Sequence, residues 1–455
     1  MKRPDIEQFS VDAMADEFEE RMVWQIEHKR ERSKQLFSQC MLEYYQRVRD
    51  AAREGRPLAF TSVLFWPDLL NSMGLTTFPA DQYTIQMIAQ GRAQEFIFRG
   101  EEFGFYKEAC SPHIATVGLA AAGAFPKPDL QYVTAQGPCD SQAALGEALN
   151  FIYDYPPIFW LNMPYRDDEE TIQYFKEELW DMVQFTEKHT DLKYDEEKLR
   201  DMQENARVCE DYFKKIHELR KLIPTPIRSR EAFSSLGPRM TSEGRPLITE
   251  FMKTQYEEIV ERVKNGVAAI PEERHRLVIG GAAPFWCMKL FDWMEEEFGA
   301  VIVVDYMNAF PRDPIGDTSD PLDCLARKAI RTNFGGRVNF TPSPPHAEAM
   351  ARIARECQAD SALFFAHFGC RQTCGQFRIV TEALKEIADI NAGVIDVDIG
   401  NPMIVSESQM KYHIAQYFEA LETSQSDRQV VRSAKSVELP KEEDPDGNPG
   451  YSVVF

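Results

Sequence analysis

The chain has 455 residues, of which 44% are hydrophobic and 11% aromatic. This length exceeds that of one usual domain and predicts two or three. Its 73 acidic and 51 basic side chains give a formal net charge of −22, which argues against a surface that binds nucleic acid or an anionic membrane.

The N-terminus and the cysteine content favour a reducing compartment. No apolar signal-peptide core is found near the N-terminus, and no stretch approaches the roughly 20 apolar residues that span a bilayer. Nine cysteines are an odd number in a long chain. Thiols, metal ligands or catalytic groups are therefore expected rather than a disulfide framework, in a cytoplasmic protein.

The first half of the chain predicts a helical segment followed by an α/β domain. Residues 12–53 show one long amphipathic pattern, interpreted as a scaffolding or partner-packing helix. Short apolar runs then alternate with helical patterns, as in a doubly wound domain. These elements are a strand at 58–65, helices at 69–73, 81–98 and 115–124, a strand at 130–135, a helix at 142–152 and a strand at 157–163.

Charged helices and a second βα series follow. Residues 167–222 read as two highly charged helices, 224–246 as a linker or lid, and 247–264 as a helix. The second series comprises strands at 277–279, 301–305, 361–365 and 394–398 and helices at 284–298, 321–332, 345–357, 379–387 and 407–422.

We therefore predict two doubly wound, Rossmann-like α/β domains with parallel sheets. The expected boundaries are a helical segment at 1–56, a first domain at 57–240 with a helical insertion at 167–222, a second domain at 241–422 and a flexible tail at 423–455.

Three cysteines differ from the others because they lie in loops rather than on helix faces. Cys139 and Cys370 each follow an apolar strand and a glycine turn, which places them at the carboxyl edge where open α/β sheets bind ligands. Cys110 lies in a loop of the first half. A site shared by all three would lie in the cleft between the domains.

Spacing alone leaves the kind of site open. None of the three cysteines belongs to a CxxC pair, although Cys374 lies four residues after Cys370, close enough to chelate a metal with it. An iron–sulfur centre, a zinc site and no metal at all remain comparable alternatives.

Several segments in order resemble one family. KEACSPHI, PDLQYVTAQGPCDSQAALGEALNFIYDYPPIFWLNMPY, RHRLVIGGAAPFW, HFGCRQTCGQFRIVTEAL and GVIDVDIGNP, together with the earlier LAFTSVLFWPDLLNSMGL, are similar to the 2-hydroxyacyl-CoA dehydratase and benzoyl-CoA reductase subunit family. The resemblance runs from about residue 57 to 422. Two departures are the extra Cys374 and an acidic strand end, Asp398 to Met403, that lacks the family's arginine.

The resemblance implies an oxygen-sensitive [4Fe-4S] cluster bound by Cys110, Cys139 and Cys370. Three thiolates leave one iron open to act as a Lewis acid and electron donor toward an acyl-CoA substrate. One electron on the thioester carbonyl gives a ketyl radical, from which a 2-hydroxyl leaves. Ser62, or Thr61 beside it, matches a family hydroxyl near the open iron and is the candidate catalytic residue.

The resemblance also implies partners. The chain has no G-x-x-x-x-G-K-[ST] loop, so an ATP-hydrolysing iron–sulfur activator would supply the electron. The working unit would be a heterodimer of two related subunits.

Smaller roles and other functions stay open. His113, His367, Arg371 and Gln372 are candidates for polar contacts in the site, and Cys287 is a reserve ligand. An aromatic acyl-CoA ring reductase, a noncatalytic electron-relay subunit and a zinc-binding structural protein are the alternatives to a dehydratase.

Overall fold

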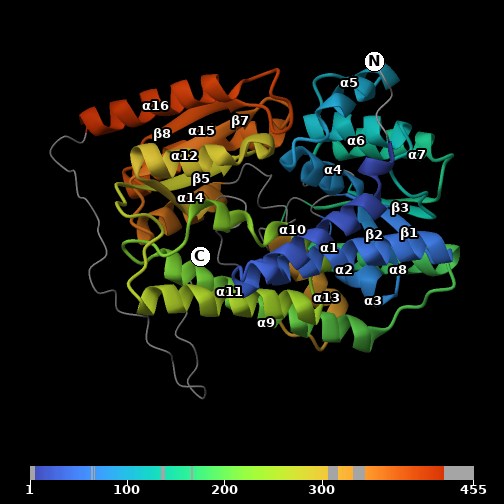
Figure 1. Cartoon of the computed structure of the whole chain (residues 1–455). Helices are drawn as coiled ribbons and strands as arrows, with labels where there is room; N and C mark the ends of the chain where they lie inside the picture. The colour runs from blue at the N-terminus through green and yellow to red at the C-terminus, as the bar shows by residue number, and fades with distance from the viewer. Residues whose placement is uncertain are drawn as a thin grey trace.

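Two four-stranded parallel sheets organise the molecule (Figure 1). This computed structural model describes residues 6–62, 65, 67–134, 139–164, 166, 168–305, 316–331 and 344–424. The first sheet has the order β2-β1-β3-β4, with β1 (Leu58–Thr61), β2 (Thr76–Pro79), β3 (Leu130–Thr134) and β4 (Ile158–Leu161). The second has the order β6-β5-β7-β8, with β5 (His275–Gly281), β6 (Ala300–Asp305), β7 (Ser361–His367) and β8 (Ala392–Val397).

The two sheets share one topology. In each, the first strand of the chain pairs with the second on one side and with the third on the other, all in parallel. The order reverses between β1 and β3, and again between β5 and β7, and such switch points are where open α/β sheets bind ligands. The predicted fold class, two Rossmann-like α/β units, is confirmed.

Helices surround both sheets and define two lobes. The first lobe consists of the first sheet with α3 (Asp68–Ser72), α4 (Ala80–Ala89), α5 (Gln94–Phe103), α6 (Ser111–Ala121), α7 (Gln142–Ile152) and α8 (Glu169–His189). The second lobe consists of the second sheet with η3 (Phe285–Cys287), α12 (Lys289–Phe298), α14 (Pro344–Glu356), α15 (Arg371–Ala388) and α16 (Glu407–Ser424). Among the described residues, no helix is both long and apolar enough to cross a membrane.

Several elements differ from the prediction. The single helix expected at 81–98 is two helices, α4 and α5, and the helix expected at 284–298 is η3 followed by α12. Strand β2 was not predicted, because its four residues, TTFP, end in a proline and form an edge strand without a long apolar run. The single helix expected at 12–53 is a hairpin of α1 (Val11–Glu27) and α2 (Arg32–Glu54). The expected linker or lid contains η2 (Ser229–Phe233) and α10 (Leu236–Ser242). The predicted tail from residue 425 onward lies outside the described residues.

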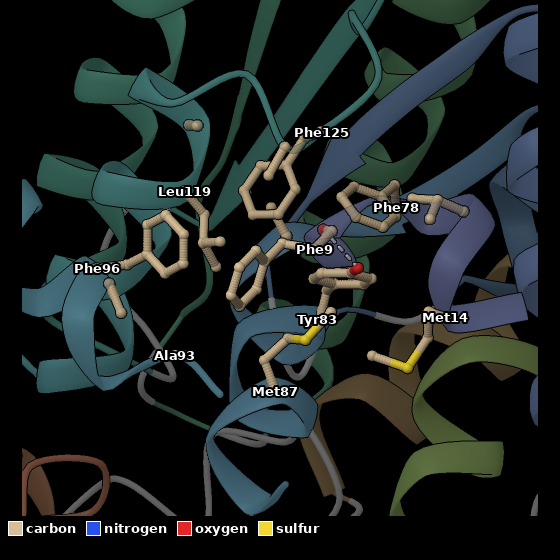
Figure 2. Packing of buried hydrophobic residues seen from close by; sticks show 14 of the residues in the cluster. Phe9, Met14, Phe78, Tyr83, Met87, Ala93, Phe96, Leu119 and Phe125 are labelled. Carbon is tan, nitrogen blue, oxygen red and sulfur yellow. Dashed lines mark hydrogen bonds between the residues drawn. The ribbon is translucent and has the colours of Figure 1, made fainter. Parts of the chain in front are cut away.

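The residues at the start of the chain pack into the core of the first lobe. Figure 2 shows Phe9, which precedes the hairpin, and Met14 from α1 in one apolar cluster with Phe78, Tyr83 and Phe125. The ring centroids of Phe78 and Tyr83 lie 5.4 Å apart, and those of Tyr83 and Phe125 lie 5.5 Å apart. The N-terminal segment therefore belongs to the folded core of this lobe.

One hydroxyl in this cluster fixes the N-terminal segment. The Tyr83 hydroxyl lies 2.8 Å from the carbonyl oxygen of Phe9 and 2.9 Å from that of Ser10 (Figure 2). Tyr83→Phe keeps the ring packing but removes this hydroxyl donor, so that the Ser10 carbonyl keeps, among the described residues, only the N–H of Met14. We therefore expect the free energy of unfolding to fall by about 1 kcal/mol. Urea titration measures this change. Tyr155→Phe, at an exposed tyrosine, is the control, and an equal loss in both variants would contradict the assignment.

Helices that join the lobes run along one side of the molecule. They are α9 (Glu196–Arg220), α10, α11 (Pro246–Lys264) and α13 (Pro321–Arg331), and Figure 1 shows α9 and α11 beside both lobes. Helix α13 follows β6 in the chain, yet its apolar face joins the core of the first lobe, where Leu325 and Ala329 share a cluster with Phe175.

A buried ionic group holds α13 in place. The ammonium of Lys328 lies 2.6 Å from a carboxylate oxygen of Asp68 on α3 and 2.9 Å from one of Glu243 beside α10. All three side chains are almost completely buried. The pKa of Lys328 is raised because the attraction of Asp68 and Glu243 outweighs the effect of its burial, so its charge is retained.

Candidate functional site

The three loop cysteines line one pocket between the lobes. This pocket has a volume of about 780 Å³ and is lined by Cys110 and Cys139 from the first lobe and by Cys370 from the second. The cleft expected from the sequence therefore exists, and residues 260 positions apart in the chain (370 − 110) border the same space. The volume is in the range of small-molecule sites.

Each cysteine lies at the start of a helix. Cys110 is the N-cap residue of α6 and Cys370 is the N-cap residue of α15. Cys139 lies two residues before Ser141, the N-cap of α7. Helix N-termini carry partial positive charge that favours thiolates. The predicted Gly-Pro turn before Cys139 lies outside the described residues.

A glycine lets the loops of the two lobes touch. A Cβ atom on Gly369 would lie 2.9 Å from the Cα of Cys110 and 2.8 Å from the carbonyl oxygen of Ala109. No real Cβ atom approaches a backbone this closely, so only glycine allows the Cys370 loop to rest on the Cys110 loop.

Polar contacts across the cleft hold the cysteine loops. The hydroxyl of Ser111, next to Cys110, donates to Asp398 at the end of β8 over 2.5 Å. The same Asp398 oxygen accepts the backbone N–H groups of Gly400 and Asn401. Arg371 lies 3.7 Å from Asp140, its partner across the cleft. The sequence identified Asp398 only as part of a departure from the family pattern, because a contact over 287 residues leaves no local signal.

Two buried histidines line the pocket beside the cysteines. His113 Nδ1 is 2.6 Å from the hydroxyl of Ser141, and its Nε2 is 3.5 Å from Asp81. His367 Nδ1 is 3.4 Å from Asp398. Burial lowers the pKa of His367 below its usual value, and the attraction of Asp398 only partly opposes this effect. Each lobe therefore contributes one buried histidine with a carboxylate beside it, His113 with Asp81 and His367 with Asp398.

The thiols disfavour ionisation in the absence of a cation. Burial raises the pKa of all three, and the pKa of Cys139 reaches about 12. For Cys110 and Cys139, repulsion from the neighbouring cysteine sulfurs is the next cause. A positively charged iron–sulfur core would remove this repulsion, because metal ligation deprotonates thiols.

The three cysteines of the pocket can be compared with the ligands that an iron–sulfur cluster needs. Within the described ranges, no three His, Cys, Asp or Glu side chains are grouped closely enough to hold a single metal ion. A [4Fe-4S] cluster takes its thiolates around a larger body than one metal ion. Three cysteines around a shared pocket, at or near helix N-termini and with pKa values raised by burial, fit such a group.

The raised pKa predicts slow alkylation of the metal-free protein. At pH 8 a thiol of pKa about 12 is almost entirely protonated, so iodoacetamide should modify Cys139 about tenfold to a hundredfold more slowly than in the urea-unfolded chain. Peptide mapping by mass spectrometry follows the rate. Equal rates in folded and unfolded protein would contradict the assigned environment.

Three further predicted residues do not line the pocket. Ser62 is buried at the end of β1, where its hydroxyl accepts a 3.5 Å contact from the backbone N–H of Thr134. Cys287 is buried in the core of the second lobe, and the thiol of Cys374 donates to the carbonyl of His367 over 3.3 Å. None of the three is among the pocket-lining residues. The catalytic role of Ser62 stays a prediction.

Comparison with known proteins places the chain in a family. The family described as 2-hydroxyglutaryl-CoA dehydratase, D-component, matches residues 65–421. The chain belongs to this family. The matched residues include all three pocket cysteines and most of both lobes, and they begin after the α1–α2 hairpin and β1. The resemblance seen in the sequence is thereby confirmed.

Individual relatives of this D-component family member are distant. The B subunit of benzoyl-CoA reductase from Thauera aromatica is 25% identical over 365 residues, covering 72% of this chain and 80% of its own. The alpha subunit of (R)-phenyllactyl-CoA dehydratase from Clostridium sporogenes is 20% identical over 333 residues, covering 70% and 81%. The alpha subunit of (R)-2-hydroxyglutaryl-CoA dehydratase from Acidaminococcus fermentans is 21% identical over 275 residues, covering 59% and 55%. The relatives of this chain are thus subunits of 2-hydroxyacyl-CoA dehydratases and of benzoyl-CoA reductase.

Proposed function

We propose that this chain is one subunit of a 2-hydroxyacyl-CoA dehydratase in which Cys110, Cys139 and Cys370 bind a [4Fe-4S] cluster. The observation that carries the proposal is the single pocket lined by these three cysteines from both lobes. They are the only cysteines of the described residues that line it. They also lie within the residues that match the dehydratase D-component family.

In the proposed reaction the cluster and the side chains of the pocket have different roles. When bound, the cluster supplies a low-potential electron and an iron with no fourth protein ligand as a Lewis acid. The chain supplies the enclosure, since apolar side chains such as Phe233, Leu236 and Phe285 line the pocket and exclude water from a radical. His113 and His367, each backed by a carboxylate, are the polar groups that orient a substrate beside the cysteines.

Two partners belong to the proposal. The sequence has no phosphate-binding G-x-x-x-x-G-K-[ST] loop, so the energy for a low-potential electron would come from a separate ATP-hydrolysing iron–sulfur activator. Relatives are named as alpha or B subunits, which supports a heterodimer with a second, related subunit.

A second function has its own support. The identity with the B subunit of benzoyl-CoA reductase, 25%, exceeds the 20% and 21% identities with the two dehydratase subunits. An aromatic acyl-CoA reductase would use the same cysteines to pass electrons to a ring rather than to expel a hydroxyl group.

Turnover of two substrates separates these functions. The purified heterodimer, with activator and ATP under anaerobic conditions, is given a 2-hydroxyacyl-CoA and, separately, benzoyl-CoA. We expect loss of water from the hydroxyacyl thioester. Turnover of the aromatic thioester alone would contradict the dehydratase function and support ring reduction.

A further inference from the structure

The pocket is locally basic in a strongly acidic protein. The whole chain carries 73 acidic and 51 basic side chains, but the pocket lining contains five basic and three acidic ones. The basic side chains are Arg21, Arg30, Lys34, Arg228 and Arg230, and the acidic ones are Glu231, Asp292 and Glu296. Lys34 and Arg228 are paired with Glu31 and Glu295 outside the lining, and Arg230 is paired with Asp292. The basic lining side chains without an ion pair to a described carboxylate are therefore Arg21 and Arg30, and unpaired guanidinium groups at a pocket favour an anionic ligand.

Arg21 on α1 forms no ion pair with a carboxylate of the described residues. Its guanidinium lies over the ring of Phe37, 5.6 Å from the centroid, and 6.0 Å from that of Phe18. Glu17, one turn earlier, is bound 2.7 Å from Arg92 instead. No described residue forms a salt bridge with Arg21, and the aromatic rings hold its guanidinium at the pocket.

A second guanidinium faces the same space. Arg230 on η2 lines the pocket and is 2.9 Å from Asp292. Burial lowers the pKa of Arg21, the attraction of Glu17 partly opposes this effect, and a smaller repulsion by Arg230 adds to it. Two arginines from segments about 200 residues apart (230 − 21) therefore line the same pocket. Arg30, on the turn between α1 and α2, forms no salt bridge with a described residue.

The α1–α2 hairpin is anchored as a wall of this pocket. Helix α2 packs against α10 and α11, and Phe37 of α2 and Phe251 of α11 both line the pocket with ring centroids 6.3 Å apart. The backbone N–H and hydroxyl of Ser33 donate to Glu258 of α11, at 3.0 and 2.5 Å. The hairpin therefore holds Arg21 at a fixed place relative to the pocket.

We propose that Arg21, together with Arg230 and Arg30, binds the phosphate groups of a CoA thioester. Guanidinium groups bind phosphate through short, paired, charge-assisted hydrogen bonds. The apolar side chains of the pocket would contact the parts of CoA that carry no phosphate. The hairpin that precedes the matched residues thus supplies substrate recognition. The choice of CoA as the phosphate carrier rests on the proposed function.

Binding of the carrier alone tests the proposal without turnover. The full-length chain in its purified complex is titrated calorimetrically with CoA and with pantetheine, which lacks the phosphates. We expect CoA to bind the unaltered protein at least about tenfold more tightly. High salt should weaken binding of CoA but not of pantetheine, because only phosphate recognition is strongly screened.

Variants of the arginines test whether these side chains are responsible for the binding of the CoA phosphates. Arg21→Gln should weaken CoA binding about tenfold or more, and the double variant Arg21→Gln/Arg230→Gln further, with pantetheine binding unchanged. Arg99→Gln is the matched control, because Arg99 also lies over a ring, 5.2 Å from the centroid of Phe96, but does not line the pocket. Circular dichroism melting confirms that each variant is folded.

The outcomes separate this inference from the proposed function. Unchanged CoA affinity in folded Arg21→Gln, or equal loss in Arg99→Gln, would overturn the phosphate site even if the dehydratase is active. Binding of CoA that depends on Arg21 in a complex without iron would support the phosphate site and contradict the cluster. Failure of the unaltered complex to bind CoA would overturn the phosphate site.

Discussion

If Cys110, Cys139 and Cys370 bind the proposed cluster, replacement of Cys370 by serine is expected to abolish iron binding. One of three thiolates is lost, and a serine hydroxyl is a much weaker ligand for iron than a thiolate. The anaerobically purified variant should contain almost no iron or sulfide and should lack the broad absorbance near about 400 nm of thiolate-to-iron charge transfer. Turnover with the activator should fall below detection.

Cys374→Ser is the matched control for this experiment. Cys374 lies one helical turn further along α15, and its thiol donates to the His367 carbonyl rather than lining the pocket. This variant should keep its iron, sulfide and EPR spectrum. A Cys370→Ser complex that has lost its cluster but still turns over would favour an electron-relay or structural role for the chain, and a colourless unaltered preparation would favour zinc.

The second large effect is expected at Gly369. In Gly369→Ala the new methyl group meets backbone atoms of Ala109 and Cys110 at 2.8 and 2.9 Å, which cannot move without separating the two cysteine loops. Overpacking of this kind costs about 1–3 kcal/mol. We expect a lower melting temperature and a clear loss of bound iron, measured by calorimetry and iron analysis.

Gly375→Ala controls for the loss of a glycine as such. Gly375 lies in α15, six residues after Gly369, and a Cβ there meets no atom within 4 Å. Alanine in a helix interior should stabilise the protein by about 0.5–1 kcal/mol and leave the iron content unchanged. Equal iron content in both variants would show that the two loops do not depend on their contact at Gly369.

Local sequence patterns predicted the sheets because their strands are short, apolar and bounded by turns. The runs around β3, β6 and β7 are buried over nearly their whole length, and an uninterrupted apolar run is what a strand covered on both faces requires. The glycine turn after β7 likewise marked Cys370 from residues next to it in the chain.

The contacts that complete the site could not be predicted in this way. Asp398 binds Ser111 across the cleft, and Arg21 lines the same pocket as Arg230 because the hairpin packs on α11. Neither pair leaves a periodic or short-range signal. The hairpin turn at residues 28–31 also escaped prediction, because the charged run there contains no proline or glycine that would end a helix.

The position of α13 couples the stability of the first lobe to that of the second, because this helix follows β6 in the chain but packs in the core of the first lobe. A chain cut after α11 would leave the first lobe without the helix that covers Leu69 and Phe175. It would also leave the buried carboxylate of Asp68 without the ammonium of Lys328, whereas Glu243 would keep Arg239. Buried carboxylates deprived of a partner cost several kcal/mol. Neither half is thus suited to separate expression, and heat should melt the molecule in one cooperative transition rather than lobe by lobe.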